Sequence, residues 1–469
     1  IATPESYFNT KLYTGTGNSG LQVSGLSFQP DFTWIKVRNN SSWNHLLIDS
    51  VRGFASDGDA KIVSSNSTEV EFERASISSF DDYGFTLGDY GGSNESSSYN
   101  YVSWNWKAGA ITHKAASFPG NASIPTSAYL GSNWNSVPFS ISFWAKSNNA
   151  NDLFAMGTGN ATGWAISFRN TSPRYVYMIS GNNCAITYTV GEWKHFVYTF
   201  DGSNSIKGYG NSILEDTQAP HSSFGSTSPI TIGQYGLAGN NFNGEIAQVR
   251  LFNKELSQSE INTVYAETAS TLSTLQILGD TSCVATWPLG TNADDLSGNY
   301  SGTSSTNVTF GVPGFLMRNT NGTIESTVSA SPESGFSIVS YTANGTAGAT
   351  IGHGLSSVPK LIIVKHRNGI SNWPVYATGL SAASKYLYLN TTDGETSNSN
   401  PDEFHSTPPT STVFSIGLSG NTNTSTGNYI AYCFANVDGY QRIGSYTGNN
   451  STNGPVSYTH LRAHETTNY

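Results

Sequence analysis

Charged residues are scarce in this chain of 469 residues, and positive charge is the scarcer sign. Lys and Arg together number 22 against 32 Asp and Glu, so the formal net charge is −10. Binding to nucleic acid requires a basic patch that neutralises phosphates, and none is visible. No apolar run reaches the roughly 18 residues that a membrane-spanning helix needs. We therefore expect neither a nucleic-acid partner nor insertion into a membrane.

Cysteine is also rare. Cys184, Cys283 and Cys433 lie far apart in the sequence, which argues against a disulfide framework and against metal-binding pairs. Helical periodicity is nearly absent, apart from residues 257–266, which open with the spacing of a capping box. No signal peptide is visible, but the chain starts at Ile1 and not at Met, so we expect the natural N-terminus to lie further upstream.

Aromatic residues and glycine are, by contrast, plentiful. Aromatic residues make up 12% of the chain, and there are 48 glycines among many Asn, Ser and Thr. This composition is typical of short strands with aromatic and β-branched inner faces, joined by Gly, Asn and Ser turns. It predicts an all-β fold, and the length predicts about three domains.

An internal repeat organises the chain. Residues 13–43 and 341–373 share one pattern, in which Pro30 corresponds to Pro359. Two further segments match in the same order, namely 85–88 with 414–417 and 100–106 with 428–434. Side chains in these segments alternate with the period of two that strands require. Each unit has the size of a small domain, so we predict two copies of a smaller β-sandwich-type repeat.

The C-terminal end departs from this pattern. Residues 441–455 repeat the opening of the unit, which indicates the start of a truncated third copy. Residues 456–469 have two histidines, an arginine and no repeat pattern, and they resemble translated sequencing-adapter read-through of the kind found in metagenomic reading frames. We therefore expect this tail to be non-native.

Between the two copies, residues 112–270 carry a different series of motifs. In order along the chain, they are AASFPGN at 115–121, FSISFWAK at 139–146, GEWKHFVYTFDG at 191–202 and FNGEIAQVRLFN at 242–253. This series resembles the laminin-G-like, concanavalin A-like jelly-roll family. The resemblance implies a central concanavalin A-like sandwich between the two repeats.

Residues 282–302 resemble the first strand and loop of the same jelly-roll family, although that segment normally precedes the others. Too few residues follow for a second jelly roll. One interpretation is that residues 284–288 fold back and add the missing strand to the central sandwich, as in a circular permutation. The alternative is a recombination remnant that serves as a linker.

These observations give a division of the chain into six parts. They are the first repeat (1–109), the jelly roll (110–272), a linker with the first-strand segment (273–334), the second repeat (335–440), the start of a third copy (441–455) and the non-native tail (456–469).

The combination of repeats and jelly roll resembles architectures of bacteriophage virion proteins that are described as tail-fibre-like or structural. The resemblance implies a non-enzymatic, adhesive protein at a virion surface, with host surface glycans or other virion proteins as partners. Fibre proteins of such families commonly form homo-oligomers, but no heptad segment supports this here. The alternative is a bacterial cell-surface adhesin with laminin-G-like modules.

A third hypothesis is a glycan depolymerase. Glu69, Glu71 and Glu73 alternate along one predicted strand, which places their carboxylates on one face, where a nucleophile and an acid/base of a glycoside hydrolase would lie. The segment lies in the small repeat and not in the jelly roll, so a charged edge strand is the favoured interpretation. His195 falls at the hairpin position of the jelly-roll family, and we expect it to be a structural histidine. No GxSxG nucleophile motif occurs.

Two ligand sites can be suggested from the sequence. Asp294, Asp295 and Asn299 form an oxygen-rich loop, and oxygen ligands suit calcium, the one cofactor that we consider. For carbohydrate binding, the candidates are tryptophans in polar segments, because the apolar face of a sugar stacks on a ring: Trp43, Trp134, Trp164 and Trp373. The alignment places Trp43 and Trp373 within one residue of the same repeat position. Core packing is the alternative for each ring.

Overall fold

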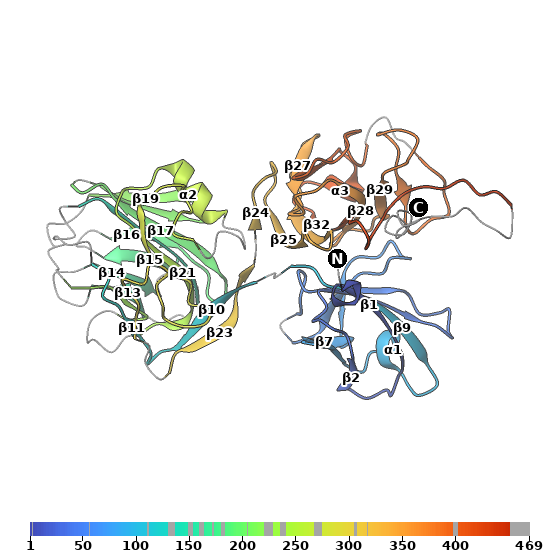
Figure 1. Cartoon of the computed structure of the whole chain (residues 1–469), viewed down its shortest axis with the longest axis horizontal. Coiled ribbons are helices and arrows are strands. Elements are labelled where there is room, and N and C mark those ends of the chain that lie inside the picture. Colours follow the sequence, from blue (N-terminus) through green and yellow to red (C-terminus); the bar gives the residue numbers. More distant parts are fainter. Residues whose placement is uncertain are drawn as a thin grey trace, which may run out of the picture. The chain divides into compact units, whose positions relative to one another are not determined.

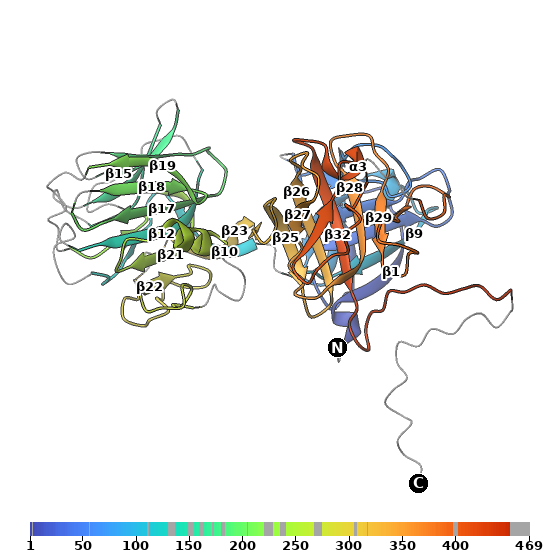
Figure 2. The same cartoon turned by 90° about the horizontal axis from the view of Figure 1, so that it is seen from above.

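The structure is a computed structural model, and it describes residues 1, 3–55, 57–109, 112–129, 137–148, 153–158, 164–170, 173–179, 183–203, 205–219, 228–234, 241–266, 274–303, 307–316, 318–396 and 402–450. The chain forms two compact units, residues 1–111 with 318–469 and residues 112–317 (Figures 1 and 2). Strands dominate both units, which confirms the all-β prediction. None of the described helices is long and apolar enough to span a membrane.

The central unit is a sandwich of two antiparallel sheets. The larger sheet has the order β19 (Ile213–Gln218), β18 (Ile206–Gly210), β17 (Lys194–Phe200), β12 (Phe139–Ser147), β21 (Asn243–Phe252), β10 (Thr112–Pro119) and β23 (Thr309–Leu316). The smaller sheet has the order β11 (Ile124–Pro125), β20 (Thr231–Ile232), β13 (Leu153–Gly157), β14 (Ala165–Arg169), β15 (Tyr175–Ile179) and β16 (Cys184–Thr187). Apolar side chains from both sheets form one buried core, as the predicted concanavalin A-like sandwich requires.

The segment after the jelly-roll motifs adds a strand to the larger sheet. Strand β22 (Cys283–Trp287) pairs antiparallel with β21, with Trp287 opposite Val249. Trp287 and Ala285 are buried in the core of the sandwich. The first-strand segment therefore folds back onto the central sheets, although it follows them in sequence.

Helix α2 (Gln258–Tyr265) covers part of the larger sheet. Its N-terminus has the predicted capping box: the Ser257 hydroxyl accepts from the Glu260 N–H, and the Glu260 carboxylate accepts from the Ser257 N–H at 2.8 Å. Together, these bonds satisfy two of the main-chain donors that a helix start leaves unpaired. The capping-box prediction is confirmed.

The first repeat, copy 1, packs a main sheet against smaller ones. The main sheet has the order β1 (Phe8–Thr14), β9 (Asn100–Trp106), β3 (Phe32–Val37) and β4 (Leu46–Asp49). The remaining elements are η1 (Pro4–Ser6), the sheet of β2 (Leu21–Ser24), β8 (Gly84–Leu87) and β7 (Ile77–Asp81), the pair β5 (Ala60–Ile62) and β6 (Phe72–Arg74), and α1 (Gly91–Asn94). One face of the main sheet forms the core of this repeat.

The second repeat, copy 2, has the same plan with additional strands. Its main sheet has the order β24 (Arg318–Asn319), β25 (Ser326–Ser331), β26 (Phe336–Thr342), β32 (Asn428–Ala435), β28 (Pro359–His366), β29 (Pro374–Ala377) and β30 (Leu387–Tyr388). The smaller sheet is β27 (Ala349–Gly352) with β31 (Val413–Ile416), and α3 is Gly420–Asn423.

The two copies repeat each other in detail. Tyr13 stacks on Tyr101 with ring centroids 5.0 Å apart in copy 1, and Tyr341 stacks on Tyr429 at 5.1 Å in copy 2. Each copy also holds two loops together with one buried asparagine: the side chain of Asn94 donates to Gly88 O, and that of Asn423 donates to Gly417 O. A Cβ at either glycine would lie 2.0 Å from a main-chain oxygen, so the close approach requires glycine.

The main sheets of the two copies face each other and share an apolar cluster. Phe32 of copy 1 stacks on Tyr432 of copy 2, with ring centroids 4.5 Å apart. Trp106 meets Phe434, the residue at the equivalent position, at 6.3 Å. An apolar cavity of about 230 Å³ lies between the copies, lined by Phe32, Trp34, Leu47, Trp106, Leu361, Ile363, Leu389, Tyr432 and Phe434. Burial of this shared face explains why the two copies form one compact unit.

Candidate functional site

The outward face of the smaller sheet in the central unit carries three aromatic rings. In β14 and β15, Ile166, Phe168 and Val176 point into the core. The residues that alternate with them point outward, because successive side chains of a strand face opposite sides. We call the set Phe154, Ser167, Arg169, Tyr175 and Tyr177 the aromatic face.

Strand pairing arranges the aromatic face in two rows. Phe154 lies opposite Ser167, and Ser167 lies opposite Tyr177. Arg169 lies opposite Tyr175 in the next row. The guanidinium carbon of Arg169 is 5.7 Å from the centroid of the Phe154 ring, and the two tyrosine rings are 5.6 Å apart. The three rings and Arg169 are half-buried, so each still presents surface to solvent.

Ser167 is the polar centre of the aromatic face. The residue is completely buried, and its hydroxyl has no hydrogen-bond partner among the residues that the structure describes. A buried hydroxyl without a partner costs free energy, on the order of 1–3 kcal/mol. The half-buried rings and the Arg169 guanidinium group, which remain accessible, suit a ligand that has both apolar faces and hydroxyl groups.

Two carboxylates of the central unit, those of Glu215 and Asp216, bind the main chain at the edge of the smaller sheet. In the edge strand β16, the Ala185 N–H donates to the Asp216 carboxylate at 2.8 Å, and the Thr187 N–H donates to the Glu215 carboxylate at 2.7 Å. Lys194 also binds Glu215, at 2.6 Å. These carboxylates therefore cap main-chain donors of an edge strand, which is a structural role.

His195 is held within the larger sheet. It is buried, its Nε2 lies 2.8 Å from the Ser142 Oγ, and its ring lies 5.0 Å from Trp144 and 5.6 Å from Tyr265 of α2. A ring that is enclosed in this way cannot reach a substrate. The prediction of a structural histidine is confirmed.

Two of the four tryptophans predicted to bind carbohydrate are buried. Trp164 is fully buried in the core of the central unit, where it stacks on Phe139 with ring centroids 6.0 Å apart. Trp373 is fully buried between the copies, and its Nε1 donates to Ser64 O and Ser67 O of copy 1, both at 3.0 Å. Neither ring has a free face for a sugar, so the prediction is wrong for both.

The other two tryptophans have different outcomes. Trp43 is half-buried and meets Tyr90 edge to face at 5.7 Å, so its role in binding stays a prediction. Trp134 lies outside the residues that the structure describes.

The strand register also corrects the alignment of Trp43 with Trp373. The equivalent lysines of the two copies mark the position: Lys36 Nζ donates to Trp43 O at 2.5 Å, and Lys365 Nζ donates to Ser371 O at 2.8 Å. Trp43 therefore corresponds to Ser371, two residues before Trp373. Sequence alignment could not detect this shift, because both copies have a tryptophan in the same loop.

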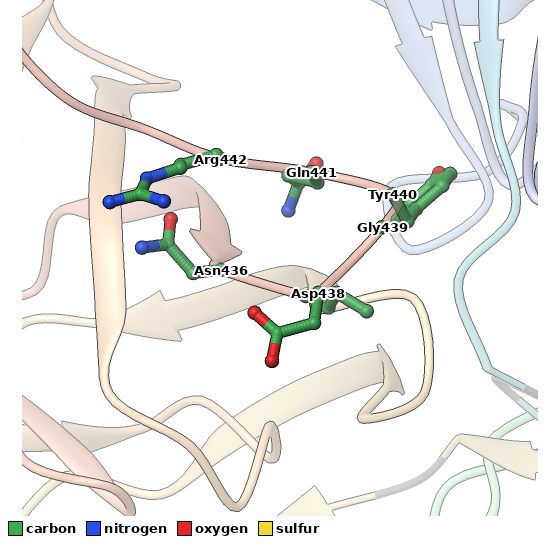
Figure 3. Close-up of a pocket in the computed structure, with 7 residues that line it drawn as sticks. Asn436, Asp438, Gly439, Tyr440, Gln441 and Arg442 are labelled. Atoms are coloured by element: carbon green, nitrogen blue, oxygen red, sulfur yellow. The ribbon is translucent and has the colours of Figure 1, made fainter. Parts of the chain in front are cut away.

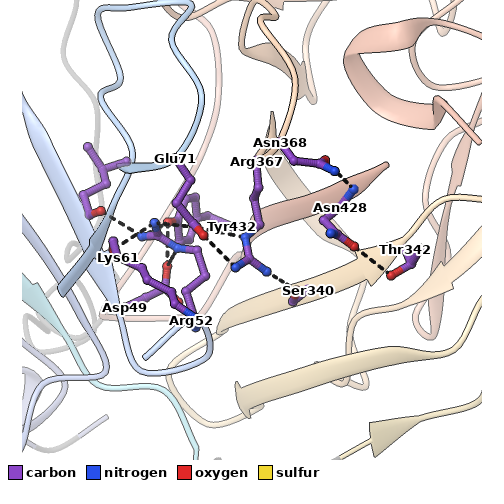
Figure 4. A network of polar contacts seen from close by, with 11 residues as sticks. Asp49, Arg52, Lys61, Glu71, Ser340, Thr342, Arg367, Asn368, Asn428 and Tyr432 are labelled. Atoms are coloured by element: carbon purple, nitrogen blue, oxygen red, sulfur yellow. Dashed lines mark hydrogen bonds and ion pairs between the residues drawn. The ribbon is translucent and has the colours of Figure 1, made fainter. Parts of the chain in front are cut away.

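The predicted carboxylate strand lies at the contact between the two copies (Figure 4). Both carboxylate oxygens of Glu71 accept from Arg367 of copy 2 at 2.8 Å, and Arg52 approaches to 3.4 Å. Burial alone would raise the pKa of Glu71, but these two guanidinium groups outweigh it and hold the pKa below its usual value. Glu69 and Glu73 are exposed. Glu71 therefore links the two repeats by ion pairs.

A fully buried group lies behind Glu71 (Figure 4). Arg52 Nε binds Asp49 at 2.6 Å, and the Tyr432 hydroxyl donates to the same Asp49 carboxylate at 2.8 Å. The side chains of Arg52 and Asp49 are both inaccessible to solvent. A buried ion pair of this kind is costly to break, because one charge would remain unpaired.

Two shallow hollows occur on the unit that the repeats form. One, of about 310 Å³, is lined by Val70, Glu71, Arg367, Asn368 and Asn428 beside the ion pairs of Figure 4. The other, of about 230 Å³, lies within the turn of residues 436–442 (Figure 3). In that turn, the Gln441 amide donates to Ala435 O at 2.6 Å, and Asn436 accepts from the Ile443 N–H at 2.8 Å, so both amides hold the turn.

The predicted calcium loop is closed by hydrogen bonds. Asp295 is buried, and its carboxylate accepts from the Thr286 N–H at 2.7 Å, from the Tyr300 N–H at 3.2 Å and from Ser297. Asp294 is exposed and accepts from Asn292, and Asn299 contributes its main-chain N–H to Ser297. Within the described ranges, no group of three or more His, Cys, Asp or Glu side chains is placed to hold a metal ion. Calcium at this loop stays a prediction, and the geometry favours a turn that Asp295 closes without metal.

The sequence analysis missed the aromatic face. The signal was the alternation of Tyr175 and Tyr177 with apolar residues in one short segment, which predicts two rings on the same side of a strand. Phe154 and Arg169 come from other strands, and only the register of the sheet brings them beside the tyrosines.

Comparison with known domains supports the description of the central unit. Residues 118–262 match the concanavalin A-like lectin/glucanases superfamily. No curated protein matches the chain.

Several solved structures are similar to parts of this chain at low identity. A Bacteroides ovatus protein assigned as carbohydrate-binding has 12% identity and a TM-score of 0.35, over 66% of this chain and 95% of that one. Domain 4 of the Geobacillus stearothermophilus arabinanase AbnA, in complex with arabinotriose, has 19% identity and a TM-score of 0.27, over 33% and 80%. The binding domain of botulinum neurotoxin serotype D has 12% identity and a TM-score of 0.33, over 67% and 86%. With TM-scores below 0.5, these likenesses carry no argument about function.

Most of the chain also matches one family. The match covers residues 3–189 and 238–464, which include both repeats and most of the central sandwich. The chain therefore belongs to the family described as Domain of unknown function (DUF7483).

Proposed function

We propose that this protein is a non-enzymatic, carbohydrate-binding adhesive protein, and that the aromatic face of its lectin-like sandwich binds the glycan. The observation that carries the proposal is the juxtaposition of the half-buried rings of Phe154, Tyr175 and Tyr177 with the Arg169 guanidinium group on one outward sheet face. Rings cover the apolar C–H face of a sugar, while the guanidinium group binds its oxygens. Covering about 60 Å² of apolar surface on one ring contributes about 1.5 kcal/mol.

A finer proposal concerns where the protein acts. We propose display at the surface of a bacteriophage particle, in a tail-fibre-like role, with host surface glycans as the ligands. The support is the resemblance of the two repeats and their inserted sandwich to virion architectures. Antibodies against the purified chain should then label phage particles in electron micrographs. Labelling of a bacterial envelope in place of particles would support the cell-surface adhesin.

The glycan site can be tested with matched tyrosine variants. Wild-type protein should bind a defined set of glycans on an array, and Tyr177→Ala should weaken that binding by about tenfold, which corresponds to about 1.4 kcal/mol. Tyr83→Ala is the control, because Tyr83 of copy 1 is 67% exposed and lies outside the central unit. Equal losses in both variants, or no change in Tyr177→Ala, would show that the glycan binds elsewhere.

A further inference from the structure

The apolar cavity between the two copies is a candidate for a second binding site. It has a volume of about 230 Å³ and lies where the main sheets of the copies face each other, so we call it the seam cavity. Phe32 and Trp34 line it from copy 1, and Leu361, Ile363 and Leu389 line it from copy 2. Among the residues that the structure describes, only apolar atoms face this space.

Polar groups of the lining side chains form their hydrogen bonds away from the seam cavity. The Tyr432 hydroxyl donates to the Asp49 carboxylate at 2.8 Å, and the Trp34 Nε1 donates to His45 Nδ1 at 2.9 Å. An ordered water needs about two to four polar partners, and apolar walls do not offer them. Apolar cavities of about 150 Å³ stay dry and bind benzene. The seam cavity therefore favours an apolar occupant over water.

The internal repeat explains why space remains at this seam. Strand register makes Leu361 the equivalent of Phe32, and Ile363 the equivalent of Trp34. Copy 1 therefore has two aromatic rings at positions where copy 2 has two smaller aliphatic side chains. All four side chains line the seam cavity, so the smaller pair leaves the volume that a second pair of rings would fill.

The rings around the seam cavity indicate the shape and the charge of an occupant. Phe32 stacks on Tyr432 with ring centroids 4.5 Å apart, and its centroid lies 5.1 Å from that of Trp106. Aromatic rings prefer offset or edge-to-face neighbours at about 4.5–7 Å, so a flat aromatic molecule would extend this cluster. A charge or a free hydroxyl would be buried there without a partner, which is costly. The walls thus select an uncharged, flat molecule.

The rim of the seam cavity is accessible to solvent. Leu389 lines the cavity and is 38% exposed, and Trp34 and Leu361 are half-buried. A small ligand can therefore enter past these side chains.

We propose that the seam cavity binds an uncharged, flat aromatic molecule of one or two rings. The site is separate from the aromatic face of the central unit, and its ligand is not a sugar, because sugar hydroxyl groups would lack partners among these walls. A ligand that binds only the folded repeats stabilises them by mass action. Occupancy of the cavity is therefore measurable as a rise in the thermal transition of the repeats.

Calorimetry of the full chain with benzene tests the proposal. Benzene at about ten times its Kd should raise the transition of the repeats by about 3 °C and leave the transition of the central unit unchanged. Benzoate, which carries a charge, should produce no shift. Cyclohexane has as many carbons as benzene but is not flat, so it should produce a smaller shift. No shift with benzene, equal shifts of both transitions, or a larger shift with cyclohexane overturns the proposal.

Matched leucine variants show where benzene binds. Leu389→Phe fills the seam cavity from its rim and should weaken benzene binding at least tenfold. Leu418→Phe is the control, because Leu418 of the same copy is 47% exposed and does not line the cavity. The transitions of both variants without benzene show that the repeats still fold. Benzene binding that is unchanged in Leu389→Phe, or equally weakened in both variants, overturns the proposal.

Discussion

Replacement of Trp373 tests whether this residue joins the two repeats or binds carbohydrate. Its indole N–H donates to Ser64 O and Ser67 O of copy 1, both at 3.0 Å, and its ring is fully buried. Trp373→Phe removes the indole N–H, so the carbonyl groups of Ser64 and Ser67 lose this hydrogen-bond donor in a buried site. An unsatisfied buried group costs about 1–3 kcal/mol, so we expect a loss of about 2 kcal/mol. Trp373→Ala adds a cavity and should cost about 3–5 kcal/mol.

The two compact units make this effect measurable by calorimetry. For a unit of this size, each kcal/mol shifts Tm by about 2–4 °C, so Trp373→Phe should lower the transition of the repeats by about 4–8 °C. The transition of the central unit should not move. Trp164→Phe is the matched control, because Trp164 lies in the core of the central unit and should shift only the other transition.

The opposite result would refute this reasoning. If Trp373→Phe left both transitions unchanged and abolished binding on a glycan array, the ring would be a ligand contact and not a structural anchor. A normal glycan profile together with a lowered transition would support the structural role.

Three further predictions follow from buried or paired groups. Glu71→Gln should lower the stability of the repeats by about 1–2 kcal/mol, because neutral hydrogen bonds replace charge-assisted ones. An assay for glycan hydrolysis should detect no activity in the wild type. Hydrolysis by the wild type that disappears in Glu71→Gln would establish the depolymerase. Burial holds the pKa of His353 at about 4, below the usual 6.5, with a small opposing effect of its bond to Thr410. The unfolded chain therefore binds more protons between these values, so stability is complete above pH 6.5 and falls by about 3 kcal/mol as the pH drops to about 4. Asp31 of the same unit, whose pKa burial raises to about 6, changes stability in the opposite direction over this range. Urea titrations should therefore compare the wild type with His353→Gln, and the difference between them should shrink as the pH falls. A chelator should leave the transition of the central unit within 1 °C, whereas Asp295→Ala should lower it by about 2 kcal/mol; a large chelator effect would establish a metal in that loop.

Local patterns in the sequence were sufficient for much of the fold. Alternating side chains predicted strands, the spacing of Ser257 and Glu260 predicted the capping box, and the ordered jelly-roll motifs predicted the central sandwich. The repeat could be detected in the sequence because its stacked tyrosines, loop asparagines and close-contact glycines occupy equivalent sequence positions in both copies. Each of these features depends on neighbours in sequence or on a spacing that the strand period fixes.

The candidate sites were less predictable, because exposure is not a local property. Trp373 and Trp43 lie in similarly polar loops, yet only Trp373 is covered by the other copy. Glu71 has the spacing of a catalytic carboxylate, and only the packed repeats show that Arg367 and Arg52 engage it. Phe154 joins Tyr177 on one face through strand register, which the sequence does not specify.

By itself, the sequence determined the all-β class, the duplicated repeat and the family of the central sandwich. These follow from strand periodicity and from motifs that lie within single segments. The tertiary structure decided that the two copies bury their main sheets against each other and that β22 returns to the central sheet. Such outcomes depend on contacts between residues hundreds of positions apart, where the free energy of burying a shared apolar face outweighs any local preference.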